Sequence, residues 1–137
     1  MKRYTVGFVF DPTLEKVLLI LKNRPEWQKG KLNGPGGKLE ENETLEACVA
    51  REIREETGLN IPPEKWAMIV EMENDTRSVH FFATIYHGKI DDAHAQTDET
   101  IVWTNTQQIP GHAIPNINWL VPLCKEKLTH QKIRSKK

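Results

Sequence analysis

The chain has 137 residues, of which 38% are hydrophobic and 28% charged, and its formal net charge is zero. This length fits a single domain, residues 1–137, with a real core, and the neutral balance gives no global reason to expect a nucleic-acid partner. No apolar run is typical of a membrane span or a signal peptide. The two cysteines lie far apart and outside any CxxC pattern, which argues against a disulfide framework. We therefore expect a soluble cytoplasmic protein.

Turn residues separate two apolar segments near the start of the chain. Residues 4–10, YTVGFVF, are rich in β-formers, and the apolar run VLLIL follows at 17–21 after the turn-forming DPTLEK. The pattern predicts a hairpin or two neighbouring strands. Residues 22–38 then hold two prolines and four glycines, and a loop of this length is usually functional or disordered.

The most distinct helical segment follows this loop. LEACVAREIREET, residues 45–57, is rich in helix formers, with Asn42 and Thr44 as candidate N-caps and Gly58 as a C-terminal cap. Beyond it, the sequence predicts strands at 66–73, 78–88 and 100–104, a closing helix at about 118–130, and a basic, frayed tail from about 129 to 137. Strands surrounding two helices predict a mixed α/β layer architecture.

The predicted helix carries its acids in an unusual place. Successive helical side chains rotate by about 100°, so with Glu52 at zero, Glu56 lies near about 40° and Glu55 near about −60°. Both fall beside an apolar stripe formed by Leu45, Cys48 and Val49. The face expected to be exposed comprises Glu43, Glu46, Ala47, Ala50, Arg54 and Thr57.

Three carboxylates on the core side of a helix would repel one another unless a cation lies among them. A glutamate run is usually a solvated helix face, but here burial and mutual repulsion would favour protonation. Arg51 can pair with Glu55 one turn later, yet one guanidinium is not enough for three acids. Mg²⁺, or Mn²⁺, with oxygen ligands and substrate phosphates is the natural partner.

The loop before the helix suits the same chemistry. Residues 33–38, NGPGGK, expose backbone, so carbonyls can reach a metal and amides can approach a phosphate. Lys38 adds a mobile cation. A Gly-Pro-Gly-Gly run alone is more often a simple turn, and its position before the acidic helix is what gives it meaning.

The segment GKLEENETLEACVAREIREETGL, residues 37–59, resembles the Nudix box, G-x5-E-x7-R-E-U-x-E-E-x-G-U with U aliphatic. The resemblance implies a Nudix α/β/α sandwich with a mixed β-sheet, whose loop-helix-loop motif binds divalent metal and hydrolyses a diphosphate linked to another moiety. All nine specified positions are filled, by Gly37, Glu43, Arg51, Glu52, Ile53, Glu55, Glu56, Gly58 and Leu59.

The resemblance also implies roles for individual residues. The glutamates at 52, 55 and 56, with the backbone carbonyl of Gly36, match the metal ligands of the family, and Arg51 matches an orienting residue. Family members activate the attacking water with one of these glutamates or with an acid on a neighbouring loop. The general base is therefore left unassigned.

Segments outside the box are similar to MutT-like enzymes that clear damaged purine nucleoside triphosphates. Asn33 matches a residue that touches the base, and Glu99 in TDET matches an acid that approaches the metal, although a plain polar loop residue is an equal alternative. Two adjacent aspartates that read the purine in the animal enzymes are absent, because Asn116 and Ile117 stand there. Asn116 could still form an amide-type pair with a base.

Trp27, in the mobile loop, could cover the base, whereas Trp66, Trp103 and Trp119 fall in patterns typical of the core.

The leading hypothesis is a Mg²⁺-dependent pyrophosphohydrolase that converts nucleoside triphosphates, including oxidised purines such as 8-oxo-dGTP, to monophosphate and pyrophosphate. Three alternatives stay open: hydrolysis of another nucleoside diphosphate derivative, trimming of RNA 5′ ends, and a nucleotide-binding regulatory module with little turnover. The complete set of box glutamates argues against the last. The expected partner is a small nucleotide, bound by a monomer or a homodimer.

Overall fold

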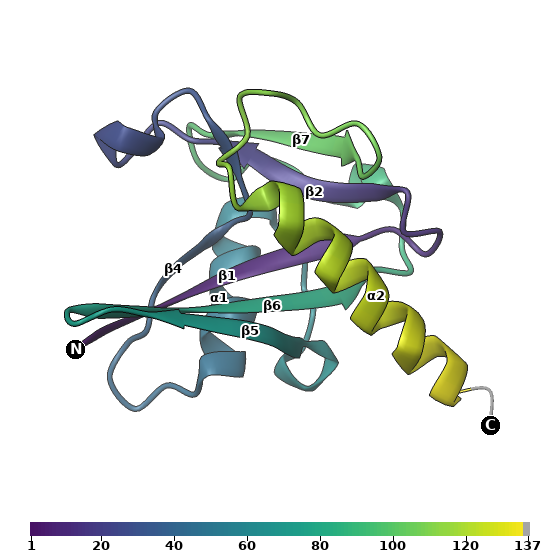
Figure 1. The fold of residues 1–137 in the computed structure, drawn as a ribbon, viewed down its shortest axis with the longest axis horizontal. Coiled ribbons are helices and arrows are strands. Elements are labelled where there is room, and N and C mark those ends of the chain that lie inside the picture. Colours follow the sequence, from purple (N-terminus) through teal and green to yellow (C-terminus); the bar gives the residue numbers. More distant parts are fainter. Residues whose placement is uncertain (136–137) are drawn as a thin grey trace.

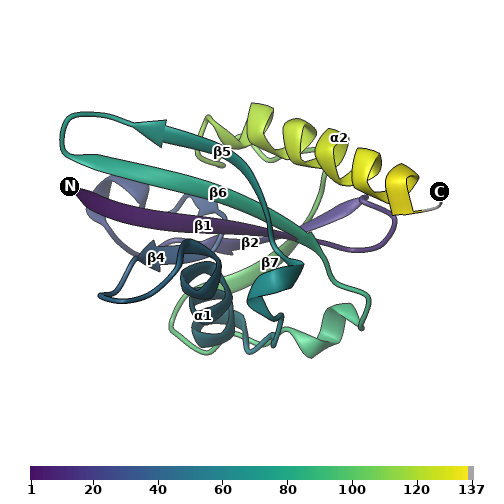
Figure 2. The same cartoon turned by 90° about the horizontal axis from the view of Figure 1, so that it is seen from below.

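The computed structural model describes residues 1–135, and this part of the chain forms a sheet covered by one helix on each face (Figures 1 and 2). The strands are β1 (Lys2–Phe10), β2 (Lys16–Leu21), β3 (Leu32–Asn33), β4 (Gly36–Lys38), β5 (Ala67–Glu73), β6 (Arg77–Ile85) and β7 (Thr100–Asn105). The helices are α1 (Leu45–Thr57) and α2 (Ile117–Ser135), with 3₁₀ helices at Glu26–Gln28, Pro63–Lys65 and Ile90–Asp92.

The sheet is mixed, as predicted. β1 and β6 pair in parallel along their whole length, whereas β1 pairs with β2, and β5 with β6, in antiparallel fashion. The expected hairpin at the start of the chain is therefore confirmed. The main path runs β3-β2-β1-β6-β5, and β7 adds to the other edge of β2.

β1 and β2 diverge, and the glycine-rich loop fills the gap between them. The two strands pair only near their turn, at Val9 with Leu18 and Phe10 with Val17. Beyond that point β4 pairs with β1 and β3 pairs with β2. Between these short strands, the carbonyl of Pro35 accepts a hydrogen bond from the Gly7 N–H at 2.8 Å. The second half of the loop predicted to be functional, residues 32–38, is thus held inside the sheet.

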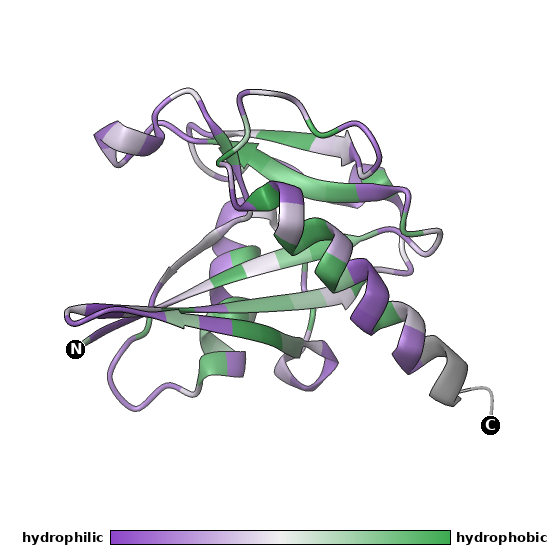
Figure 3. Cartoon of the chain, viewed as in Figure 1, coloured by the Kyte–Doolittle hydropathy of each residue, from purple (hydrophilic) through white to green (hydrophobic). Residues whose placement is uncertain are grey.

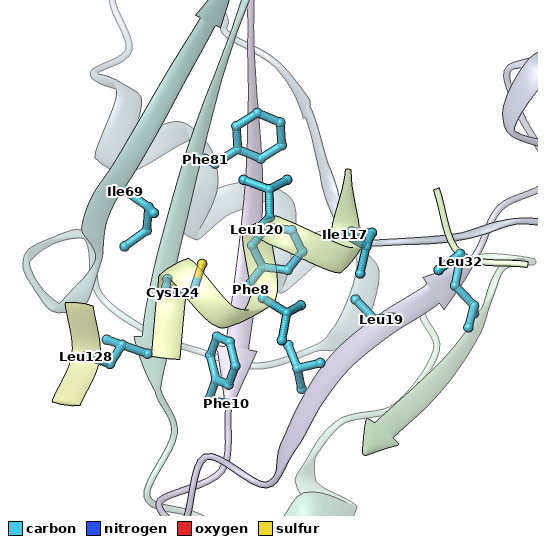
Figure 4. Close-up of a cluster of buried hydrophobic side chains, with 14 of the residues drawn as sticks. Phe8, Phe10, Leu19, Leu32, Ile69, Phe81, Ile117, Leu120, Cys124 and Leu128 are labelled. Carbon is cyan, nitrogen blue, oxygen red and sulfur yellow. The ribbon is translucent and has the colours of Figure 1, made fainter. Parts of the chain in front are cut away.

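Two apolar cores lie on the two faces of the sheet. The core under α2 includes Phe8, Phe10, Phe81 and Leu120 (Figure 4), and the core under α1 includes Val9, Val49, Ile53, Trp66 and Phe82. Figure 3 shows the apolar residues concentrated on the central strands and on the first turns of α2. Burial on both faces produces the α/β/α sandwich that the sequence predicts.

The caps of α1 are as expected, but its exposed face is not. The Thr44 hydroxyl accepts a hydrogen bond from the Ala47 N–H at 3.1 Å, and Gly58 closes the helix in the left-handed conformation, with φ of 76°. Ala50 and Thr57, expected to be exposed, are buried. The helix rests on the sheet through Ile53, so its buried face is centred away from Glu52.

The closing helix is longer than predicted. α2 continues to Ser135, beyond the expected end at about residue 130. The frayed tail expected from about residue 129 stays a prediction, and residues 136 and 137 lie outside the described part. Pro122 lies inside α2, beyond its first turn, so its missing N–H removes one intrahelical hydrogen bond. No helix among residues 1–135 is both long and apolar enough to span a membrane.

Replacing one leucine of α2 tests how much the fold depends on this helix. Leu120→Ala is expected to lower the free energy of unfolding by about 2–5 kcal/mol, because it leaves a cavity under a fully buried side chain. Leu123→Ala, at the half-buried edge of the same core, should cost about 1 kcal/mol. Urea denaturation measures both, and equal losses would contradict this packing.

Candidate active site

The glycine-rich loop meets α1 at Gly36 and Gly37. A Cβ added to Gly36 would collide with the carbonyl oxygen of Thr5, and one added to Gly37 would collide with the carboxylate of Glu52. Only glycine allows this close approach. The backbone of β4 is therefore pressed between β1 and the acidic edge of α1.

The Arg51 guanidinium connects the acids of the box to one another. Its Nε lies 2.7 Å from Glu43 Oε2, and its Nη1 lies 2.8 Å from Glu52 Oε1 and 3.3 Å from Glu55 Oε2. Its Nη2 donates to the Lys38 carbonyl at 3.1 Å. The hydrogen bond with Glu43 and the neighbouring charges raise the pKa of Arg51, and the same bond lowers the pKa of Glu43.

The planar fork of Arg51 offers five donors and contacts Glu43, Glu52 and Glu55. As expected, one guanidinium does not serve all three of Glu52, Glu55 and Glu56. Two expectations about exposure are corrected. Glu43 precedes the helix and is only 13% exposed against Arg51, whereas Glu55, expected on the core side, is 52% exposed.

Of Glu52, Glu55 and Glu56, Glu56 is the one that forms no ion pair with Arg51 in the described part of the chain. Its Oε2 is buried and has no hydrogen-bond partner among the described residues. Burial, reinforced by the charge of Glu52, raises the pKa of Glu56 to about 8, while Lys22 opposes that shift. Burial also raises the pKa of Glu52. A buried carboxylate with an oxygen that lacks a partner is costly unless a proton or a cation compensates it.

Glu99 lies close enough for its charge to contribute to the raised pKa of Glu56. The Glu99 side chain is 5% exposed; Lys22 Nζ lies 3.2 Å from its Oε1, and the Asn23 N–H donates to its Oε2 at 2.6 Å. Sequence reasoning missed Lys22 and Asn23. The pairing of Leu21 with Thr100 brings them to Glu99, and that register could not be read from the sequence.

The residues predicted to bind substrate fall into two groups. The chain after β7 runs beside β3, since the Leu32 N–H donates to the His112 carbonyl and the Ile114 N–H to the Leu32 carbonyl. This brings half-buried Asn116 to the same edge as Asn33. The Asn116 Oδ1 is buried and has no partner among the side chains that the structure describes.

Trp27 and Lys38 are more peripheral. Trp27 is 58% exposed on a 3₁₀ helix, and Lys38 is exposed at the end of β4. Trp66 is buried as expected, but Trp119 is 44% exposed on the first turn of α2, so its assignment to the core is wrong.

The donor set at the acidic edge suits a hard divalent cation. Glu52, Glu55, Glu56 and Glu99 could supply carboxylate oxygens, and Gly36 could supply a carbonyl. The described residues contain no preformed group of three acidic, histidine or cysteine side chains that could hold a metal ion. Mg²⁺ typically uses one or two carboxylates and completes its shell with water and substrate phosphates, so the unpartnered oxygen of Glu56 is a fitting donor.

Comparison with known proteins identifies the family. The NUDIX domain model matches residues 1–121, and the chain belongs to this family. It is 30% identical over 130 residues to the oxidized purine nucleoside triphosphate hydrolase of Mus musculus, covering 90% of this chain and 80% of the mouse protein. The chain is thus a MutT-like Nudix hydrolase, an enzyme acting on phosphoric anhydride bonds.

Solved structures share the fold. A MutT structure from work on Aliivibrio salmonicida and Vibrio cholerae has a TM-score of 0.70 and 19% identity, covering 88% of this chain and 97% of that one. A bifunctional NMN adenylyltransferase/ADP ribose pyrophosphatase from Francisella tularensis, complexed with AMP and an Mn ion, also has a TM-score of 0.70 and 19% identity. It matches 92% of this chain but only 41% of its own length.

Replacing Arg51 by lysine tests the network. A single ammonium cannot reproduce the fork, so Arg51→Lys is expected to lower the free energy of unfolding by about 1–3 kcal/mol and turnover by at least about tenfold. Arg54→Lys, exposed on the same helix, is the matched control and should change stability by less than about 0.5 kcal/mol. Chemical denaturation that finds the two variants equally stable would contradict the network.

The raised pKa of Glu56 predicts a pH dependence in the metal-free protein. The folded state keeps a proton on Glu56 up to about pH 8, whereas the unfolded state loses it near 4.5. The contribution of Glu56 to the free energy of unfolding should therefore be greatest at and below its unfolded pKa of 4.5, and it should fall as the pH rises towards 8. Melting temperatures in chelator should show this slope for the wild type and for Glu46→Gln. The slope should be flatter for Glu56→Gln, and identical slopes would refute the shift.

Proposed function

We propose that the protein is a Mg²⁺-dependent pyrophosphohydrolase that cleaves nucleoside triphosphates, oxidised purines among them, to monophosphate and pyrophosphate. The observation that carries the proposal is the buried, unpartnered oxygen of Glu56, which lies near two further acids, Glu52 and Glu99, where α1 meets the loop. A cation at this place would relieve the repulsion between these carboxylates, and the phosphates of a nucleotide would bind to the cation.

The roles of the side chains follow from their surroundings. Glu52, Glu55, Glu56, Glu99 and the Gly36 carbonyl would hold Mg²⁺, with Mn²⁺ as a substitute, and Glu55 would do so from the exposed rim of the site. A bound divalent ion supplies charge neutralisation on phosphate oxygens and lowers the pKa of a bound water. Arg51 orients the acids, exposed Lys38 can reach a phosphate, and the base that deprotonates the attacking water stays open among the glutamates.

The nucleobase would lie between Asn33 and the segment that carries Asn116, whose preceding residues run beside β3. The amides of Asn33 and Asn116 offer both a donor and an acceptor, and the Asn116 oxygen still lacks a donor among the described residues. Trp27 and Trp119 expose aromatic surface suited to stacking. The mouse relative, named for oxidized purine nucleoside triphosphates, supports a purine substrate.

Neutral variants of the acids test the assignment. Glu56→Gln and Glu55→Gln are expected to lower turnover by about 10²-fold or more while the fold persists, because the neutral amide removes charge from the metal site. Glu46→Gln, an exposed position in the first turn of α1, should retain wild-type turnover. Near-wild-type rates in both Glu55 and Glu56 variants would overturn the assignment.

A substrate panel with Mg²⁺ decides between the proposed reaction and its alternatives. Normal and oxidised nucleoside triphosphates should release pyrophosphate, and chelation should abolish the release. Release of phosphate alone would refute the mechanism. Preference for ADP-ribose or for 5′-triphosphate RNA would show that the substrate belongs to one of these other classes. Absence of any turnover would favour a nucleotide-binding module.

A further inference from the structure

The segment between β2 and β3 is an exposed loop with one inward-facing side chain. Its base is closed by hydrogen bonds from the Lys22 N–H to the Lys31 carbonyl at 2.9 Å and from the Gly30 N–H to the Lys22 carbonyl at 2.8 Å. Gly30 adopts a φ of 80°, which favours glycine. Residues 23–31 are all exposed except Gln28, which is half-buried.

The Gln28 side chain contacts the Asn33 amide, and the contact has a defined direction. The Gly34 N–H lies 2.8 Å from one terminal atom of Asn33. A backbone N–H can only donate, so that atom is the oxygen, Oδ1. The other terminal atom is then Nδ2, which can only donate, and Gln28 Oε1 accepts from it at 3.0 Å.

These two bonds use only part of the hydrogen-bonding capacity of the Asn33 amide. An amide carries two N–H donors and an oxygen with two lone pairs. Gly34 occupies one lone pair and Gln28 one N–H, so one donor and one acceptor remain for a ligand. Such an amide can pair with a base that presents both an acceptor and a donor.

We infer that Gln28 is a positioning residue that holds the Asn33 amide in the orientation required to read the nucleobase. The inference rests on the proposed nucleotide substrate and deepens it. The Gln28 side chain hydrogen-bonds Asn33 and contacts none of the box acids among the described residues, so its loss acts on base selection and leaves the chemical step intact. Without it, only the Gly34 N–H is left to orient the Asn33 amide, and the remaining donor and acceptor are held less firmly.

Two substitutions distinguish the effect of losing the acceptor atom of Gln28 from the effect of changing the size of its side chain. Gln28→Met keeps the length but removes the acceptor, whereas Gln28→Glu keeps an acceptor oxygen. Gln28→Met is expected to raise KM for the preferred nucleoside triphosphate about three- to tenfold, the effect of one hydrogen bond, with kcat unchanged. KM for poor bases should change little, so selectivity falls by the same factor.

Gln28→Glu should restore KM and selectivity to within about twofold of wild type, because its carboxylate still accepts from Asn33. Gln107→Met, at an exposed glutamine outside the site, is the matched control. A base selectivity in Gln28→Met equal to that of the wild type would overturn the inference.

An NMR measurement reads the contact without turnover. The side-chain NH₂ signals of Asn33, assigned through their disappearance in Asn33→Asp, should shift in Gln28→Met and stay near the wild-type position in Gln28→Glu. Unchanged signals in Gln28→Met would overturn the inference. A wild-type protein that releases no pyrophosphate from any triphosphate would refute the proposed function, and the NMR signals would still decide whether Gln28 holds Asn33.

Discussion

The active site depends on one guanidinium. Arg51 extends from α1 to Glu43 before the helix, to Glu52 on the helix and to the Lys38 carbonyl at the end of β4. It thereby joins the helix to the loop that lies between β1 and β2. Since Gly36 and Gly37 bring backbone into contact with β1 and Glu52, a smaller or less directional cation could not hold these parts at such close approach.

The same interaction makes the acids unequal. Glu43, Glu52 and Glu55 share Arg51, and Glu56 is left with a buried oxygen without a partner among the described residues. Lys22, whose charge opposes the rise in the pKa of Glu56, is itself paired with Glu99. The electrostatic imbalance is thus concentrated on the side of α1 that faces the loop, where a divalent ion and phosphates would be most stabilised.

Much of the fold follows from local patterns. The Thr44 cap, Gly58 and the strands around them are recognisable because capping and β-branched runs act over a few residues. The exposed face of α1 was wrong at Ala50 and Thr57 for a specific reason. Helical rotation establishes which residues share a face, but the position of the sheet decides which face is buried. Trp119 was misplaced because an apolar pattern in α2 did not reveal where the helix leaves the core.

The sequence by itself determined the grouping of Glu52, Glu55 and Glu56, because residues three and four apart on a helix are neighbours whatever the rest of the chain does. Tertiary structure alone decided which other residues join them. Lys22 and Asn23 meet Glu99 across 77 and 76 residues through the register of β2 and β7. Asn116 reaches the edge of Asn33 only because the chain after β7 pairs with Leu32. Such contacts depend on strand register and chain path, which no local spacing encodes.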